Sequence, residues 1–276
     1  MAEITLNGTG FPSEAAAAAA AAAAEGCNFP LDSAKMWMLS PPSGALQHTK
    51  KLFLSERAGR AQAAEFLRKN AANALSIANL LAGLSSILCS LNGQSHYACL
   101  LILIGFLLDL ADGAVARQLK ACSDLGAKLD DFADFTTFGL ASALLLQAHG
   151  LLDGLLAILY VLAVFTRLCF FHSGVPFMYR GLPCPYGAAV LATTYLLTRG
   201  NLLVMCLIAL VMILFMVDQG FYPHDQVLES QAWKKAVYAG GVVMLLFSAS
   251  PLSPLYYLTW SVSYIFFPSL LWSCKV

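Results

Sequence analysis

The chain has 276 residues, of which 59% are hydrophobic and only 12% are charged, and its 16 Lys and Arg residues balance its 16 Asp and Glu residues. So low a charged fraction excludes an ordinary soluble globular domain, in which about a quarter of the residues are charged. A nucleic-acid partner is also excluded, because no basic excess exists to neutralise phosphates. We therefore expect an all-α, polytopic transmembrane helical bundle that contacts membrane lipids.

The chain divides into three predicted regions. Residues 1–50 include a run of ten alanines and are predicted to form a disordered, low-complexity tail. Residues 51–71 interleave basic and apolar side chains, which favours an N-terminal amphipathic interfacial helix; a solvated basic linker is the alternative. Residues 72–272 are predicted to be the transmembrane domain, with six to eight spans. The candidate spans are 74–92, 97–118, 126–149, 151–171, 185–198, 201–217, 236–250 and 254–272.

The basic residues orient these spans. With eight spans and a cytosolic N-terminus, Arg199 is the only one of the 16 Lys and Arg residues on the far side of the membrane. The positive-inside rule therefore favours this orientation, which places the loop after the second span at the cytosolic surface. The composition of the tail favours the endoplasmic reticulum as the membrane.

Cysteine and aromatic residues give weaker signals. The eight cysteines are scattered and form no C-x2-C pair, which argues against a zinc site and against a disulfide framework. Tyrosine and tryptophan residues near the C-terminus are interpreted as interfacial anchors. They are Tyr256, Tyr257, Trp260, Tyr264 and Trp272.

Six of the ten aspartates lie in the window from residue 109 to residue 134. Asp109 and Asp112 are three residues apart, and Asp130 and Asp134 are four apart, so each pair shares one face of its helix. Four converging carboxylates would repel one another, and divalent cations relieve that repulsion. Oxygen ligands favour Mg²⁺, Mn²⁺ or Ca²⁺, and paired metals suit transfer at phosphorus. The alternative is that these acids only solvate the interface.

The window contains the complete pattern D-x2-D-G-x2-A-R-x8-G-x3-D-x3-D, which resembles the signature of the CDP-alcohol phosphatidyltransferase family. The flanking NALSIAN and RGLPCPYGAA segments are similar to the phosphatidylserine synthase branch, so the resemblance covers about residues 72–190. One segment departs from the pattern: that branch reads R-L-A-R-F-N where this chain reads RLCFFH. The lost second arginine weakens the case for serine as the acceptor.

The resemblance implies a membrane enzyme that transfers the phosphatidyl group of CDP-diacylglycerol to a small alcohol and releases CMP. Serine is one candidate for this alcohol. It also implies two Mg²⁺ or Mn²⁺ ions, a role in phospholipid biosynthesis, and a homodimer. The implied metal ligands are Asp109, Asp112, Asp130 and Asp134, the last also being the general base. The implied CDP and phosphate residues are Gly113, Ala116, Arg117, Gly126, Asn73, Ser76 and Asn79. The implied acceptor residues are Arg167, His172 and Arg180.

Other functions stay open at this point. An enzyme of the same family would use the same acids with another acceptor, or with a CDP-alcohol as donor. A catalytically inactive descendant would serve as a membrane binding or scaffold protein, which the RLCFFH segment suggests. A transporter or channel fits less well, because the acids gather at one surface instead of following a path.

Overall fold

The computed structural model describes residues 48–120, 123–147, 150–170, 178–218, 220–223, 231–248, 250–268 and 272, with side chains described from residue 70 onward. The predicted tail, residues 1–50, lies almost entirely outside these ranges. Residues 54–276 form one compact unit, to which the following description applies. This unit is mainly helical, as predicted.

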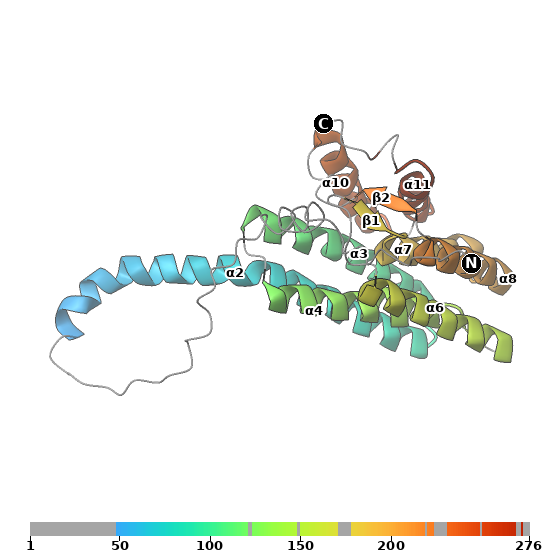
Figure 1. Ribbon diagram of the computed structural model, residues 1–276, viewed down its shortest axis with the longest axis horizontal. Helices are drawn as coiled ribbons and strands as arrows, with labels where there is room; N and C mark the ends of the chain where they lie inside the picture. The colour runs from blue at the N-terminus through green and yellow to red at the C-terminus, as the bar shows by residue number, and fades with distance from the viewer. Residues whose placement is uncertain are drawn as a thin grey trace, which may run out of the picture. The chain divides into compact units, whose positions relative to one another are not determined.

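Each candidate span overlaps a helix or a run of helical segments, with bounds that differ by up to several residues (Figure 1). The helices are α2 (His48–Leu91), α3 (Ser95–Gln118), α4 (Asp124–Asp134), α5 (Ser142–Leu144), α6 (Leu151–Phe170), α7 (Cys184–Thr198), α8 (Leu202–Val217), α10 (Ala232–Leu246) and α11 (Leu252–Phe266). Three segments of the described helices are long and apolar enough to cross a membrane: Asn70–Leu91, Ser95–Gln118 and Leu151–Phe170. The shorter α8 is also apolar. The total number of spans therefore stays a prediction.

Helix α2 runs without a break through residues 71 and 72, where the sequence predicted a boundary between an interfacial helix and the first span. The expected position of residues 51–71 on the membrane surface, and the domain boundaries drawn there, stay predictions.

The third candidate span is not one regular helix. Helix α4 ends at Asp134, a π-helical turn (η3, Phe135–Ala141) follows, and α5 completes the run. The Thr137 hydroxyl in η3 donates to the backbone oxygen of Asn79 in α2 at 3.0 Å. π-Helical turns are rare in proteins, and those that occur often lie at functional sites. Here the turn begins directly after one of the four motif acids.

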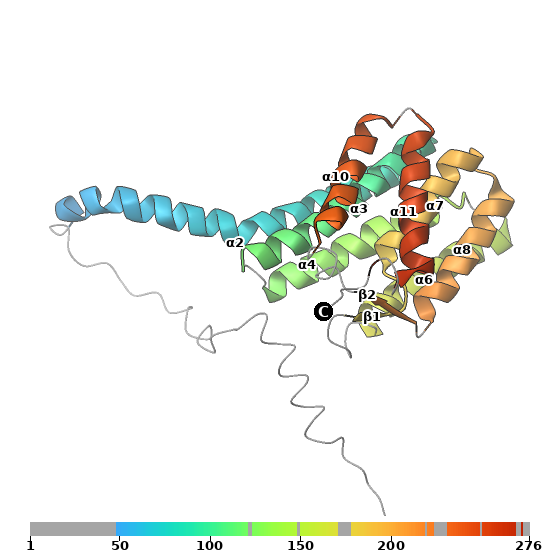
Figure 2. The ribbon, with the colours of Figure 1, turned by 90° about the horizontal axis from the view of Figure 1, so that it is seen from above.

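An aromatic cluster joins α3, α7 and α11, which lie side by side in Figure 2. Tyr186 of α7 stacks on Tyr264 of α11, with ring centroids 3.9 Å apart. Phe106 of α3 meets Tyr186 and Trp260 edge-on, each at 5.2 Å. Every residue of α7 from Cys184 to Thr194 is buried. Because α7 is buried on all sides, it is the central helix of the bundle.

The interpretation of the C-terminal aromatic residues as interfacial anchors is wrong for Tyr257, Trp260, Tyr264 and Trp272, whose side chains are buried. Tyr264 donates its hydroxyl proton to the Pro223 backbone oxygen at 2.7 Å. These side chains are large enough to fill the space between α7, α10 and α11, and packing there outweighs their preference for a membrane surface.

Large apolar side chains are exposed on the outer faces of α2, α6 and α8, where a lipid environment suits them. The all-α prediction missed a short antiparallel ladder in which β1 (Met178–Arg180) pairs with β2 (Phe221–Pro223). Gly181 then donates its N–H to the Gly220 oxygen at 2.8 Å, and Leu182 donates to the Phe215 oxygen at 2.9 Å. The ladder and these bonds tie the segment before α7 to the end of α8.

Candidate metal and phosphate site

Three carboxylates meet where α3 and α4 face each other. Asp109 and Asp112 project from one face of α3, and Asp130 projects from α4. One oxygen atom from each lies within 4.8 Å of the others. Asp112 is only 5% exposed, so little solvent reaches it to screen the repulsion. A donor set of carboxylate oxygens fits a hard divalent cation.

Asp134 lies one helical turn beyond Asp130 and outside that group of three. Its side chain is within hydrogen-bonding reach of Asp109. It is 8% exposed; its Oδ2 atom accepts a hydrogen bond from the Cys184 thiol at 3.6 Å. Among the described residues, its Oδ1 atom has no hydrogen-bond partner. Asp134 is thus a buried carboxylate with one oxygen hydrogen-bonded to the Cys184 thiol and the other oxygen buried without such a bond.

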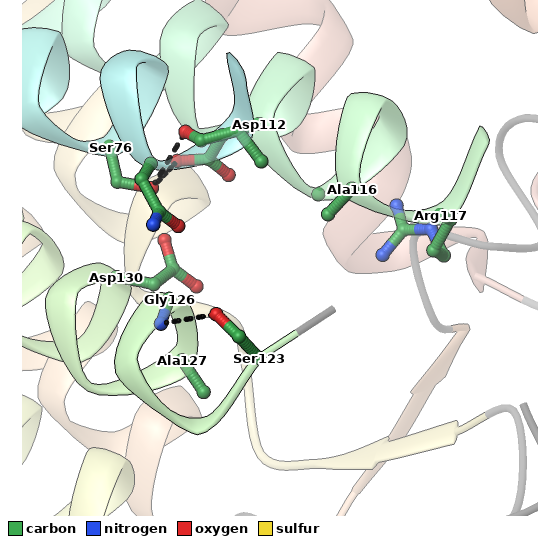
Figure 3. Close-up of a pocket in the computed structure, with 11 residues that line it drawn as sticks. Ser76, Asp112, Ala116, Arg117, Ser123, Gly126, Ala127 and Asp130 are labelled. Atoms are coloured by element: carbon green, nitrogen blue, oxygen red, sulfur yellow. Dashed lines mark hydrogen bonds between the residues drawn. The ribbon is translucent and has the colours of Figure 1, made fainter. Parts of the chain in front are cut away.

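A cavity of about 220 Å³ opens beside the acids (Figure 3). In Figure 3 the carboxylates of Asp112 and Asp130 face the same space from two helices, with Ser76 beside Asp112. The Ser76 hydroxyl donates to Asp112 Oδ2 at 2.7 Å and also lies 3.3 Å from the Ala72 backbone oxygen. The cavity is lined by Ala72, Asn73, Ser76, Asp112, Gly113, Ala116, Arg117, Ser123, Gly126, Ala127 and Asp130.

The two motif glycines make room for polar side chains of the protein itself. A Cβ atom at Gly113 would lie 3.1 Å from Nη1 of Arg117. A Cβ atom at Gly126 would lie 2.9 Å from Oδ1 of Asn73. The glycines therefore let a guanidinium and an amide approach the backbone beside the acids, where they can bind phosphate oxygens.

The start of α4 is fixed by a cap. Ser123 precedes the helix with extended backbone, and its hydroxyl accepts the Gly126 N–H at 3.0 Å. Asp124 in the first turn is favoured by the helix dipole. Ser123 was not among the predicted site residues, although a serine followed by an aspartate at a predicted helix start is a capping signal. Ala72 and Ala127 carry no such signal.

The remaining predicted site residues do not line the cavity. Asn79 is fully buried, and its backbone oxygen accepts a hydrogen bond from Thr137. Arg167 of α6 donates from Nη1 to the sulfur of Cys184 at 3.3 Å and so reaches the surroundings of Asp134. Arg180 is exposed and lies over the Phe221 ring at 5.9 Å from its centroid. His172 lies outside the described residues.

Sequence comparison finds a matching protein family and several relatives of this chain. A family model described as CDP-alcohol phosphatidyltransferase matches residues 69–268. Transmembrane protein 269 of Homo sapiens is 56% identical over 193 residues, which cover 70% of this chain and 95% of that protein. The CDP-diacylglycerol–serine O-phosphatidyltransferase of Bacillus subtilis is 36% identical over 132 residues, 44% of this chain and 74% of that enzyme. The archaetidylserine synthase of Methanothermobacter thermautotrophicus is 31% identical over 158 residues, 54% of this chain and 68% of that enzyme.

Proposed function

This chain belongs to the CDP-alcohol phosphatidyltransferase family and is a transferase of that family, and we propose that it moves the phosphatidyl group of CDP-diacylglycerol to a small alcohol and releases CMP. The observation that carries the proposal is the group of three carboxylates beside the cavity that Asn73, Gly113 and Arg117 line.

The donor would bind at the cavity. Asp109, Asp112 and Asp130 would hold divalent cations, with Asp134 helping to ligate a second ion, and the set of oxygen ligands favours Mg²⁺ or Mn²⁺. When bound, such ions neutralise charge on the pyrophosphate oxygens and make CMP a better leaving group. Asn79 would support the residues that contact the nucleotide and its phosphates. The contacting residues would be the lining residues Asn73, Ser76, Gly113, Ala116, Arg117 and Gly126.

The acceptor would bind next to Asp134. The carboxylate accepts the proton of the acceptor hydroxyl as the new P–O bond forms and the bond to CMP breaks. The Oδ1 atom of Asp134, which has no hydrogen-bond partner among the described residues, supports this role. Arg167, which reaches this region through Cys184, would bind an anionic group on the acceptor. His172 and Arg180 are weaker acceptor candidates, since neither is placed at the site by a described contact.

The proposal includes the setting of the enzyme. We propose a multi-pass protein of six to eight spans in the endoplasmic reticulum, with the acids facing the cytosol and two chains forming a homodimer. The 15 Lys and Arg residues on one side of the eight-span arrangement support this orientation.

A direct assay tests the proposal. Purified full-length protein is incubated with Mn²⁺, CDP-diacylglycerol and, in separate reactions, serine, inositol, glycerol 3-phosphate or no acceptor. We expect CMP release that depends on one acceptor and falls at least about 100-fold in Asp134→Asn. The matched control is Asp153→Asn, because Asp153 also contacts a cysteine, Cys206, but lies outside the site.

The products separate the alternatives. Formation of a phosphodiester lipid from CDP-diacylglycerol supports the proposal and identifies the acceptor. Activity only with a CDP-alcohol and diacylglycerol would show that the donor is a CDP-alcohol, and it would contradict the proposed donor CDP-diacylglycerol. Metal-dependent binding of CDP-diacylglycerol without CMP release from any acceptor would contradict the proposal and favour a binding or scaffold protein.

A further inference from the structure

We propose that Cys184 is a positioning residue that holds the Asp134 carboxylate and the Arg167 guanidinium in place for the acceptor. The proposal rests on the proposed function, because it assigns a role in that reaction. Cys184 lies in the RGLPCPYGAA segment, which is similar to the phosphatidylserine synthase branch.

The thiol connects three helices. Cys184 is the first residue of α7 and is fully buried. Its sulfur accepts a hydrogen bond from Nη1 of Arg167 in α6 at 3.3 Å and donates to Oδ2 of Asp134 in α4 at 3.6 Å. A thiol both accepts and donates, so one atom satisfies the cation and the anion together.

The backbone around the thiol is fixed. Gly181 has a φ of +70°, and a Cβ atom there would overlap the Met216 backbone oxygen. Pro183 precedes α7, and Pro185 occupies its first turn. Leu182 donates its N–H to the Phe215 oxygen at 2.9 Å. These restraints set where the sulfur lies, independently of Asp134 and Arg167.

The sulfur also sets where its two partners lie relative to each other. The guanidinium of Arg167 and the carboxylate of Asp134 both contact this one atom. Truncating the side chain to alanine removes both hydrogen bonds, so it releases both groups from these positions.

Steady-state kinetics test this role. Cys184→Ala and Cys184→Ser are compared with Cys206→Ala, whose sulfur lies 3.9 Å from Oδ1 of Asp153 in a similar pair away from the site. We expect Cys184→Ala to lower kcat about tenfold and to raise the acceptor KM, with the KM for CDP-diacylglycerol within about twofold of wild type. Cys184→Ser should keep at least about a third of kcat, because a hydroxyl also accepts and donates. Cys206→Ala should match wild type.

A second measurement does not depend on turnover. The melting temperatures of Cys184→Ala, Asp134→Asn and the double variant should be non-additive by about 2 °C, since the two side chains are in contact. If wild type releases no CMP with any acceptor, the proposed function fails, and this thermal cycle still tests the contact. Additive melting temperatures would overturn the proposal. It would also be overturned by an equal loss of kcat in Cys184→Ala and Cys184→Ser, or by wild-type kcat in Cys184→Ala.

Discussion

The two halves of the site are built in different ways. The proposed metal ligands Asp109, Asp112 and Asp130, here called the metal face, come from a single 22-residue stretch and lie beside an open cavity. The proposed acceptor side, formed by Asp134, Arg167 and Cys184, brings together residues up to 50 positions apart, and its Asp134 and Cys184 are buried. The spacing of residues along the helices determines the metal face, and the packing of distant helices determines the acceptor side.

The largest effect is expected on the metal face. Asp112→Asn replaces a charged ligand with a neutral amide, and we expect the rate of CMP release to fall at least about 100-fold at saturating CDP-diacylglycerol and Mn²⁺. Asp124→Asn is the control, since Asp124 is exposed in the first turn of α4 and lies outside the group of three. If Asp112→Asn released CMP at more than a tenth of the wild-type rate, the metal face would not show the larger effect that we expect of it.

The next effect distinguishes two arginines on the acceptor side. Arg167→Gln should reduce kcat/KM for the acceptor about tenfold to 100-fold, because it removes charge-assisted hydrogen bonds next to Asp134. Arg180→Gln should change it by less than about twofold, because Arg180 is exposed and lies against Phe221. Arg180 lies in strand β1. If Arg180→Gln and Arg167→Gln lose activity equally, the β1–β2 ladder also takes part in acceptor binding.

A smaller effect is expected from Gly113→Ala. The added methyl group would lie 3.1 Å from Nη1 of Arg117 and would displace the guanidinium. We expect the KM for CDP-diacylglycerol to rise about threefold to tenfold, with the acceptor KM unchanged. In an Arg117→Ala background the same substitution should add little. A full additional loss in that background would mean that Gly113 acts on the donor directly.

The smallest effect is on stability. Ser123→Ala removes the side-chain cap of α4, which costs about 1 kcal/mol. We expect the melting temperature to fall by about 2–4 °C, while the acceptor KM stays within about twofold because the acceptor side lies at the other end of α4. A change in the acceptor KM larger than in the donor KM would show that the two halves are coupled through α4.

Much of the fold could be predicted from the sequence. Apolar runs located the helices because a lipid-facing helix must be apolar along its length. The pairs Asp109–Asp112 and Asp130–Asp134 could be assigned to shared helix faces because that relation depends only on helical periodicity. The structure places Ser76 and Gly113 in one cavity with Asp112 and Asp130, and their contact with CDP or phosphate stays a prediction.

Contacts between distant helices could not be predicted. Nothing in the local sequence indicates that Cys184 touches both Arg167 and Asp134, since this depends on how α4, α6 and α7 pack. The burial of Tyr264 against Tyr186 was missed for the same reason. The spacing of apolar residues does not reveal the π-helical turn after Asp134.

The Ser76 hydroxyl carries a single proton but has two acceptors in reach, Asp112 Oδ2 at 2.7 Å and the Ala72 backbone oxygen at 3.3 Å. If an ion bound that carboxylate oxygen, the hydroxyl could rotate to the carbonyl one turn back along α2 and keep a hydrogen bond. Binding of an ion at Asp112 would therefore not leave the buried hydroxyl of Ser76 without an acceptor.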